Sequence, residues 1–438
     1  MATVLMKSSL GQAVPMPYSA GLVIGPPSET GLCGFRHTLH RLPSRPRPPG
    51  PNVESFAALA LTVYMADKAF ARWRTEDAWT RDLDASVGVG SGFLPALPIL
   101  TEALCFLSGD RWQLNTHGNV PPVGPCASYG DFAPHAVCLF SGGIDSLAGA
   151  IDLVEGGARV ILVSHFEKGT DGHVQRLLAG RLISEYGSER VLHVPVQVCA
   201  AESVEKSTRT RSLLFIALAL MVASAFGDEV PIYIPENGFV GLNIPLTGSR
   251  VGSYSTRTTH PSYLAAVRHA LRAASIGHPI LNPYGCLSKG GVVQSCGNAA
   301  LLRRLVPLTL SCAKAGALRW AGRSPARNCG RCYPCLMRRA ALHSIGADDA
   351  SDYVYDAIGG EDMLYAPRLG MDLRCLLQAV YRLRRPGASP FLELLRTGSL
   401  SSLRDAKEPL PAIQAGLVEF AALVSDKGCN GVRTYVSL

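Results

Sequence analysis

Hydrophobic positions in the first 130 residues predict alternating helices and strands. Four elements are expected, in the order helix, strand, helix, strand, over residues 55–74, 75–83, 97–107 and 111–115. Before them, prolines repeat through residues 42–51, and each proline removes a backbone donor and blocks helix propagation. We therefore expect an N-terminal α+β accessory module at residues 1–130, with a proline-rich linker near 42–51.

From residue 135, short apolar runs alternate with amphipathic stretches. The predicted strands are residues 136–140, 159–163, 191–194 and 231–234, and the predicted helices are residues 147–155, 174–186 and 211–226. Short runs of this kind are typical of strands that a parallel sheet buries on both faces. We expect an α/β domain at 131–345, with helices on both faces of its parallel sheet. A helical C-terminal extension at 346–438 should follow.

Composition sets the broad class of the protein. Apolar residues make up 47% and charged residues 17% of 438 residues, so the chain should fold, into two or three domains. The net charge of +8 is modest and the arginines are spread out. Nucleic-acid binding is therefore not indicated, since an anionic small substrate explains this charge equally well.

Cysteine usage and hydropathy predict a reduced, non-membrane protein. The thirteen cysteines are sparse for this length, and the first residues lack the pattern of a secretory signal. The longest apolar run, residues 213–226, is shorter than the roughly 18 residues of a membrane span. We expect a cytoplasmic protein in which this run is a buried helix.

A glycine-rich turn follows the first strand of the central domain. The run Ser141–Ser146 has the sequence SGGIDS and leads directly into a predicted helix. Gly142 and Gly143 allow the backbone to approach an anion, which the free amides at the helix start attract. Ser141 and Ser146 add hydroxyl donors. On this geometry alone, the alternative is an ordinary tight turn between strand and helix.

Asp145 within this turn refines the prediction. Phosphate alone would repel a carboxylate, so we expect Asp145 to hold a magnesium ion that bridges phosphates. The order Ser-Gly-Gly-x-Asp-Ser after an apolar strand resembles the ATP-binding loop of PP-loop ATP pyrophosphatases, and the chain lacks a Walker A motif. The turn therefore predicts binding of ATP with Mg²⁺.

Four cysteines form a predicted metal site. Cys329, Cys332 and Cys335 stand at two-residue spacing, and Cys312 lies upstream. Four thiolates suit tetrahedral Zn²⁺, and a site closed by protein ligands is structural. The alternatives are an iron–sulfur cluster and buried cysteines without a metal. The other cysteines are scattered and are interpreted as ordinary core thiols.

Both motifs together resemble the 7-cyano-7-deazaguanine synthase (QueC) family, over roughly residues 135–345. Further similarity lies in Arg211–Phe215 (RSLLF), Leu287–Lys289 (LSK) and Leu310–Cys312 (LSC). The resemblance implies a Rossmann-like PP-loop fold in which ATP adenylates the carboxylate of 7-carboxy-7-deazaguanine. Pyrophosphate is released, and an amine then displaces AMP.

The chain departs from this family at its substrate segment. In place of the family's Tyr-Pro-Asp-Cys-Arg stand residues 235–248 and then 253–260. This segment and the extra N-terminal module resemble the QueC-like proteins (QatC) of the Qat antiphage defence system. That resemblance implies an acceptor amine from either ammonia or the N-terminus of a partner protein of the same operon (QatB-like).

The remaining candidate residues each have an ordinary structural alternative. Lys289 and Arg211 are expected to offset charge on the departing pyrophosphate; the alternatives are an exposed lysine and a solvated arginine at a helix end. Six more residues follow predicted strands or precede a helix: Glu236, Asn237, Arg257 and His260 as substrate contacts, and His165 and Phe166 as adenine contacts. Turn formation, helix capping or a half-buried loop explains them equally well.

We therefore expect an ATP-dependent ligase acting on a deazapurine carboxylate in antiphage defence. One alternative is a PP-loop enzyme with another substrate, in tRNA modification, amidation or NAD synthesis. Sulfur transfer would need a carrier thiol such as Cys199, and no paired catalytic cysteines support it. The other alternative is a non-catalytic nucleotide-binding scaffold subunit of a defence complex.

Overall fold

A computed structural model describes most of the chain. The described residues are 2–7, 20–23, 35–117, 123–167, 169–200, 203–247, 257–315, 327–383, 385, 387–395 and 409–436. They form an α/β fold of two compact units. The first unit contains Met1–Ser141, Gly157–Ile234 and Thr256–Leu281, and the second contains Gly142–Gly156, Pro235–Ser255 and Asn282–Leu438. The domain boundaries expected at residues 130 and 345 stay predictions. Neither of them coincides with a boundary between these two units.

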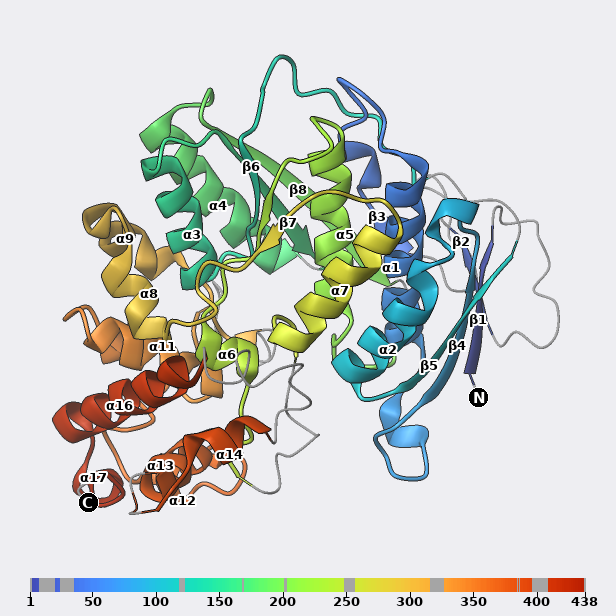
Figure 1. The fold of residues 1–438 in the computed structure, drawn as a ribbon. Helices are drawn as coiled ribbons and strands as arrows, with labels where there is room; N and C mark the ends of the chain where they lie inside the picture. Colours follow the sequence, from blue (N-terminus) through green and yellow to red (C-terminus); the bar gives the residue numbers. More distant parts are fainter. Residues whose placement is uncertain are drawn as a thin grey trace. The chain divides into compact units, whose positions relative to one another are not determined.

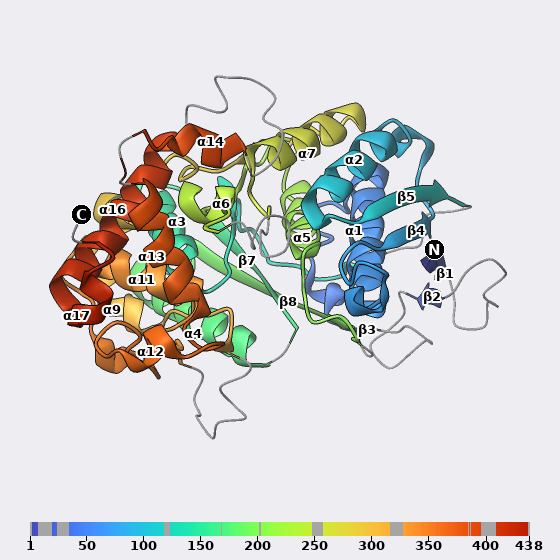
Figure 2. The same cartoon turned by 90° about the horizontal axis from the view of Figure 1, so that it is seen from below.

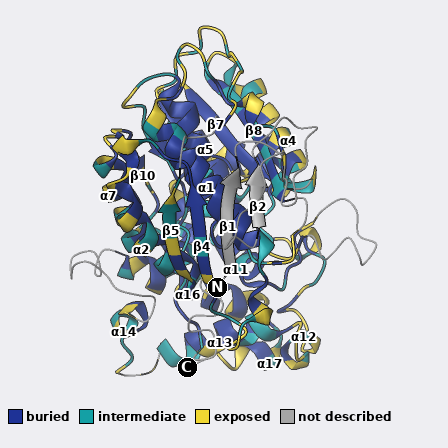
Figure 3. Cartoon of the chain, turned by 90° about the vertical axis from the view of Figure 1, so that its right-hand side faces the viewer, coloured by how far each residue is buried: buried dark blue, intermediate teal, exposed yellow. Residues whose placement is uncertain are grey.

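A six-stranded sheet dominates the first unit, in the order β10-β9-β6-β7-β8-β3. Its strands are β3 (Phe35–His37), β6 (Ala136–Leu139), β7 (Val160–Phe166), β8 (Val191–Ala200), β9 (Ile232–Tyr233) and β10 (Ile280–Leu281). All neighbours pair in parallel except β3, which is antiparallel to β8. These pairings confirm the expectation of a mainly parallel sheet (Figure 1). Every residue of β6 and β7 is buried, as the colour of β7 in Figure 3 shows.

A second, four-stranded parallel sheet has the order β2-β1-β4-β5. Its strands are β1 (Ala2–Lys7), β2 (Ala20–Val23), β4 (Asp82–Val87) and β5 (Arg111–Thr116). Helix α1 (Pro51–Ala69) packs against both β4 and α5 (Arg211–Ser224). Contact on both sides explains why almost all of α1 is buried. A continuous apolar core joins this layer to the six-stranded sheet.

The strand predicted at 75–83 is wrong, because β4 begins only at Asp82. Most of that stretch is a turn held by Asp77, whose carboxylate accepts hydrogen bonds from the amides of Trp79 and Thr80. The Trp79 ring lies under the guanidinium of Arg209, 4.3 Å from the ring centroid. The hydrogen bonds to Asp77 satisfy backbone amides that a strand would need to pair, and the cation–π contact holds the Trp79 side chain.

The other helices of the first unit are α2 (Ala96–Ser108), α4 (Gly169–Tyr186) and α7 (Pro261–Ala273). Helices α4 and α5 pack on the sheet, and α2 packs on α7. Helix α5 matches the apolar run expected to be a buried helix. No helix in the described ranges combines the length and apolar character that crossing a membrane requires.

The second unit is built from helices around its own apolar core. They are α3 (Ile144–Glu155), α6 (Gly238–Leu242), α8 (Lys289–Ser295), α9 (Ala299–Leu305), α11 (Tyr333–His343), α12 (Asp362–Tyr365), α13 (Met371–Leu383), α14 (Pro390–Leu395), α16 (Leu410–Lys427) and α17 (Asn430–Arg433). Helix α16 packs against α6, α8, α11, α13 and α14 (Figures 1 and 2). The described residues after 345 are mainly helical, as their pattern predicts, with turns and irregular segments between helices α12, α13, α14, α16 and α17.

Candidate functional site

The glycine turn after β6 has the strand–turn–helix geometry that its sequence predicts. Gly142 has φ +85°, a conformation that side chains with a Cβ rarely adopt. Gly143 is the extended N-cap of α3, and its carbonyl accepts a hydrogen bond from Ser146 Oγ at 3.0 Å. The amide of Leu310 donates to the Gly142 carbonyl at 3.0 Å. Ser141, the first residue of the turn, belongs to the first unit, and the residues from Gly142 to Gly156 belong to the second.

Asp145 lies in the first turn of α3 and binds two other predicted site residues. Its Oδ1 accepts a hydrogen bond from Lys289 Nζ at 2.5 Å. Its Oδ2 accepts from the Asn237 side-chain amide at 2.5 Å and from the Asn237 backbone amide at 3.2 Å. The side chains of Asp145 and Lys289 are only 10% and 7% exposed. The second unit therefore contains a buried Asp145–Lys289–Asn237 cluster.

Short helices position both partners of Asp145. Ser288 is the N-cap of α8 and places Lys289 as its first residue. Asn237 is the N-cap of α6, where its Oδ1 accepts a hydrogen bond from the amide of Val240 at 3.0 Å. Asn237 thus performs the turn role and contacts Asp145 with the other end of its amide. Lys289 is not an exposed loop lysine, so that alternative is wrong.

The cluster leaves limited room for a metal at Asp145. A carboxylate has about four acceptor positions, and three are used by Lys289 and Asn237. One position remains, which fits magnesium held by a single protein carboxylate with its other ligands from phosphate and water. Asp145 could therefore supply one ligand to a metal ion.

Arg211 and His165 form a separate contact in the first unit. Arg211, the first residue of α5, donates from Nε to His165 Nδ1 at 3.1 Å and from Nη2 to the His165 carbonyl at 3.0 Å. His165 Nε2 lies 3.1 Å from the Val198 carbonyl, so the ring proton belongs on Nε2. Burial, together with the nearby charge of Arg211, lowers the pKa of His165 to about 3. Arg211 is therefore oriented by a neutral imidazole.

His165 and Phe166 are the last residues of β7, not residues of a following loop. The strand pairing continues to Phe166 because the His165 ring is satisfied inside the protein. His165 has no exposed surface, so its present contacts are all with protein. Phe166 is nearly buried, and the guanidinium of Arg176 lies 5.6 Å from its ring centroid. An adenine contact by either residue stays a prediction.

Sequence reasoning missed a polar group beside Arg211. Tyr64 of α1 donates its hydroxyl to Glu167 Oε1 at 2.5 Å, and Lys68 Nζ lies 3.6 Å from the same oxygen. Tyr64 also packs edge-on against the His165 ring, with 5.7 Å between centroids. The signal available was a tyrosine and a lysine four residues apart within an apolar helix, which places both on one face.

The other predicted substrate residues belong to different units. Glu236 belongs to the second unit, where its amide donates to Asn282 Oδ1 at 3.4 Å. In the first unit, Arg257 donates to the carbonyl of Phe106 at 2.7 Å. His260 caps α7, as its structural alternative predicts, and burial lowers its pKa to about 4. The adjoining residues 248–256 of the altered substrate segment lie outside the described residues.

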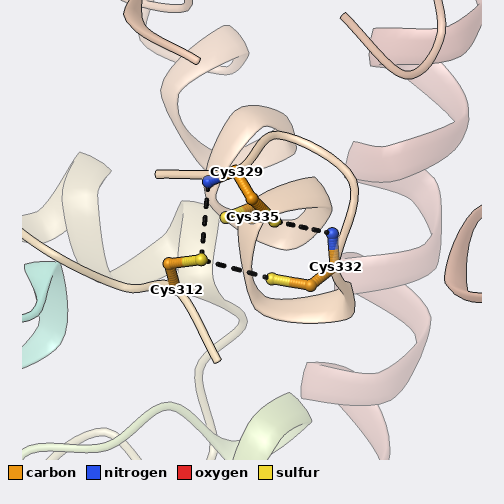
Figure 4. A group of neighbouring side chains, drawn as sticks. All are labelled: Cys312, Cys329, Cys332 and Cys335. Atoms are coloured by element: carbon orange, nitrogen blue, oxygen red, sulfur yellow. Dashed lines mark hydrogen bonds between the residues drawn. The ribbon is translucent and has the colours of Figure 1, made fainter. Parts of the chain in front are cut away.

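The four predicted cysteine ligands converge in the second unit (Figure 4). All four sulfurs lie within 4.8 Å of one another. The Cys312–Cys332 sulfur separation is 3.9 Å and the Cys329–Cys335 separation is 3.8 Å. A tetrahedral Zn²⁺ with Zn–S bonds of about 2.3 Å requires sulfurs about 3.8 Å apart. This four-cysteine group could therefore hold a metal such as zinc.

The backbone around the cysteines is shaped for thiolates. The amides of Cys329 and Cys332 donate to the sulfurs of Cys312 and Cys329 at 3.4 and 3.3 Å. Gly330 has φ +78°, and a Cβ there would lie 2.0 Å from the carbonyl oxygen of Tyr355, so this position requires glycine. Cys332 is the N-cap of α11, whose positive end favours negative charge.

Comparisons of the chain with models of known protein families, with curated proteins and with solved structures found no match. The case for a function therefore depends on the residues and on their geometry.

Proposed function

We propose that the chain is an ATP-dependent carbon–nitrogen ligase of the QueC-like PP-loop type. The observation that carries the proposal is the buried Asp145–Lys289 pair, whose aspartate belongs to the SGGIDS turn. A lysine and an aspartate are seldom buried without a functional or structural reason. Here, the pair is next to a left-handed glycine turn at the start of an α-helix, an arrangement suited to phosphate.

The proposed reaction has two steps. A carboxylate oxygen of the substrate attacks the α-phosphorus of ATP, and the bond to pyrophosphate breaks. The amine nitrogen then attacks the activated carbonyl carbon, loses a proton and expels AMP. We propose 7-carboxy-7-deazaguanine as the carboxylate, with ammonia or a partner protein's N-terminus as the amine, in antiphage defence.

The chain's own residues supply charge and orientation in this proposal. Lys289 is held beside the turn by Asp145 and is suited to offset negative charge that develops on the pyrophosphate. Asn237 fixes the other carboxylate oxygen of Asp145. Magnesium would use the remaining acceptor position of Asp145 and neutralise phosphate charge. The four-cysteine group, which we propose holds structural zinc, stabilises the start of α11.

The test is incubation of the purified protein with α-labelled ATP, Mg²⁺, 7-carboxy-7-deazaguanine and ammonia or the partner protein. We expect labelled AMP, and a mass increase on the accepting amine. Lys289→Met should lower the rate by about 10²-fold or more. Lys206→Met is the matched control, because Lys206 is exposed in the first unit.

Other products separate the alternatives. Formation of ADP and phosphate would contradict adenylation. AMP that does not depend on the deazapurine would support a PP-loop enzyme with another substrate. Nucleotide binding without any turnover under these conditions would favour the scaffold subunit.

A further inference from the structure

Helix α16, in the C-terminal part of the chain, contacts the elements that hold both partners of Asp145. Ala412, Gly416 and Glu419 are spaced at i, i+4 and i+7, so they share one face of the helix. Helix α16 packs on α6, which begins after Asn237, and on α8, which begins with Lys289. All of these elements belong to the second unit.

The contact with α8 is made by the carboxylate of Glu419. Its Oε2 accepts a hydrogen bond from the amide of Gly290 at 2.9 Å, and its Oε1 accepts one from the hydroxyl of Ser288. A Cβ on Gly290 would lie 2.3 Å from the Glu419 carboxyl carbon, so glycine is needed for this approach. Glu419 therefore binds the residues on both sides of Lys289.

The contact with α6 is made by small residues of the same face. A Cβ on Gly416 would lie 2.6 Å from the ring of Phe239, and one on Gly238 would lie 3.0 Å from Ala412 Cβ. Close packing at these two points fixes the first turn of α6. Asn237, the N-cap of that turn, then presents its amide to Asp145.

We propose that Glu419 is a positioning residue for Lys289 and that α16 is an integral part of the Asp145 site. This inference rests on the proposed function, and it assigns a role to a helix beyond the region that resembles the QueC family. Without the Glu419 carboxylate, the Ser288–Gly290 turn loses two hydrogen bonds. The Lys289 ammonium then samples positions away from Asp145 and from departing pyrophosphate.

The first test is kinetic and uses the full chain. We expect Glu419→Ala to lower kcat for AMP formation by about tenfold or more while KM for ATP changes by less than about threefold, because the lost effect belongs to the transition state. Glu419→Gln should recover most of the rate, since its amide oxygen still accepts from Gly290. Gln414→Ala is the control, because Gln414 is exposed on the same helix. An unchanged kcat in Glu419→Ala would overturn the proposal.

The second test does not depend on activity. Hydrogen exchange of the α8 peptide should be about tenfold faster in Glu419→Ala than in wild type or Gln414→Ala, because two of its hydrogen bonds are lost. Gly290→Ala should also speed exchange of the α8 peptide, because it disrupts the same contact at the Gly290 position. This variant replaces Glu419→Ala in the test if Glu419→Ala does not fold. Unchanged exchange in the folded variant would refute the positioning role. Absence of AMP from wild type, with faster exchange in the variant, would refute only the proposed function.

Discussion

Asp145 illustrates how one residue can carry both stability and chemistry. It is buried against Lys289 and Asn237, so its removal leaves an ammonium group without its counterion. We expect Asp145→Ala to lower the free energy of unfolding by about 3–5 kcal/mol, the usual cost of breaking a buried pair from one side. Urea unfolding measures this loss, and AMP formation should disappear.

A double variant distinguishes the electrostatic contribution of the Asp145–Lys289 pair to stability from the contribution of side-chain packing. Asp145→Asn combined with Lys289→Met removes both charges and nearly preserves shape, so we expect it to be more stable than either single variant. It should still form no AMP. If the single losses simply add in the double variant, the pair is not coupled in the folded protein.

The lowered pKa of His165 predicts that the stability of the folded protein depends on pH. Its folded pKa of about 3 lies below the unfolded value, because burial disfavours the charged ring. Between pH about 6.5 and 3 the unfolded chain binds more protons at this residue, so stability falls as pH falls through that window. We expect His165→Gln to weaken this fall, as measured by unfolding at pH 4.5 and 7.5. His173→Gln, at an exposed position of α4, should retain it. An identical pH dependence in His165→Gln would contradict the assignment.

At the scale of elements, hydrophobic periodicity predicted the helices and strands whose apolar spacing is visible within their own residues. Strand β6 and helices α2, α3 and α5 lie close to their predicted bounds, because apolar spacing there reports burial directly. Strand β3, only three residues long, has no pattern of its own and depends on pairing with β8. The end of β7 was predicted at residue 163, three residues early, because the sequence does not show that Arg211 and Val198 contact the His165 ring within the fold.

The residues of the candidate sites also differ in how well the sequence alone predicts them. The cysteine cluster was predictable because three of its ligands stand at regular spacing in the sequence. The four sulfurs converge as expected. Glu419 was not predictable, since a single glutamate in an apolar helix resembles any solvated residue. Its role depends on Gly290, which is far away in the chain and close only after folding.

At the scale of the whole molecule, the two compact units should respond differently to metal removal. All four cysteines belong to the second unit, and α11, which begins at the cluster, packs on α16. Metal binding that requires a folded site contributes to the stability of the unit that contains the site, by about 10 kcal/mol or more in small zinc domains. We therefore expect one tightly bound zinc per chain, with its stabilising effect concentrated in the second unit.

Hydrogen exchange measured along the chain tests this expectation. After removal of metal with a chelator at neutral pH, exchange should rise in Tyr333–His343 and Leu410–Lys427, while β6 to β8 keep their protection, because the parallel strands are fully paired without the metal. Cys332→Ser should reproduce the pattern and lower zinc content, whereas Cys126→Ser, at an exposed cysteine of the first unit, should change neither. Metal analysis that finds no zinc in pure wild-type protein would contradict the site. Simultaneous loss of protection in both units would instead show that the two units unfold cooperatively when the metal is removed.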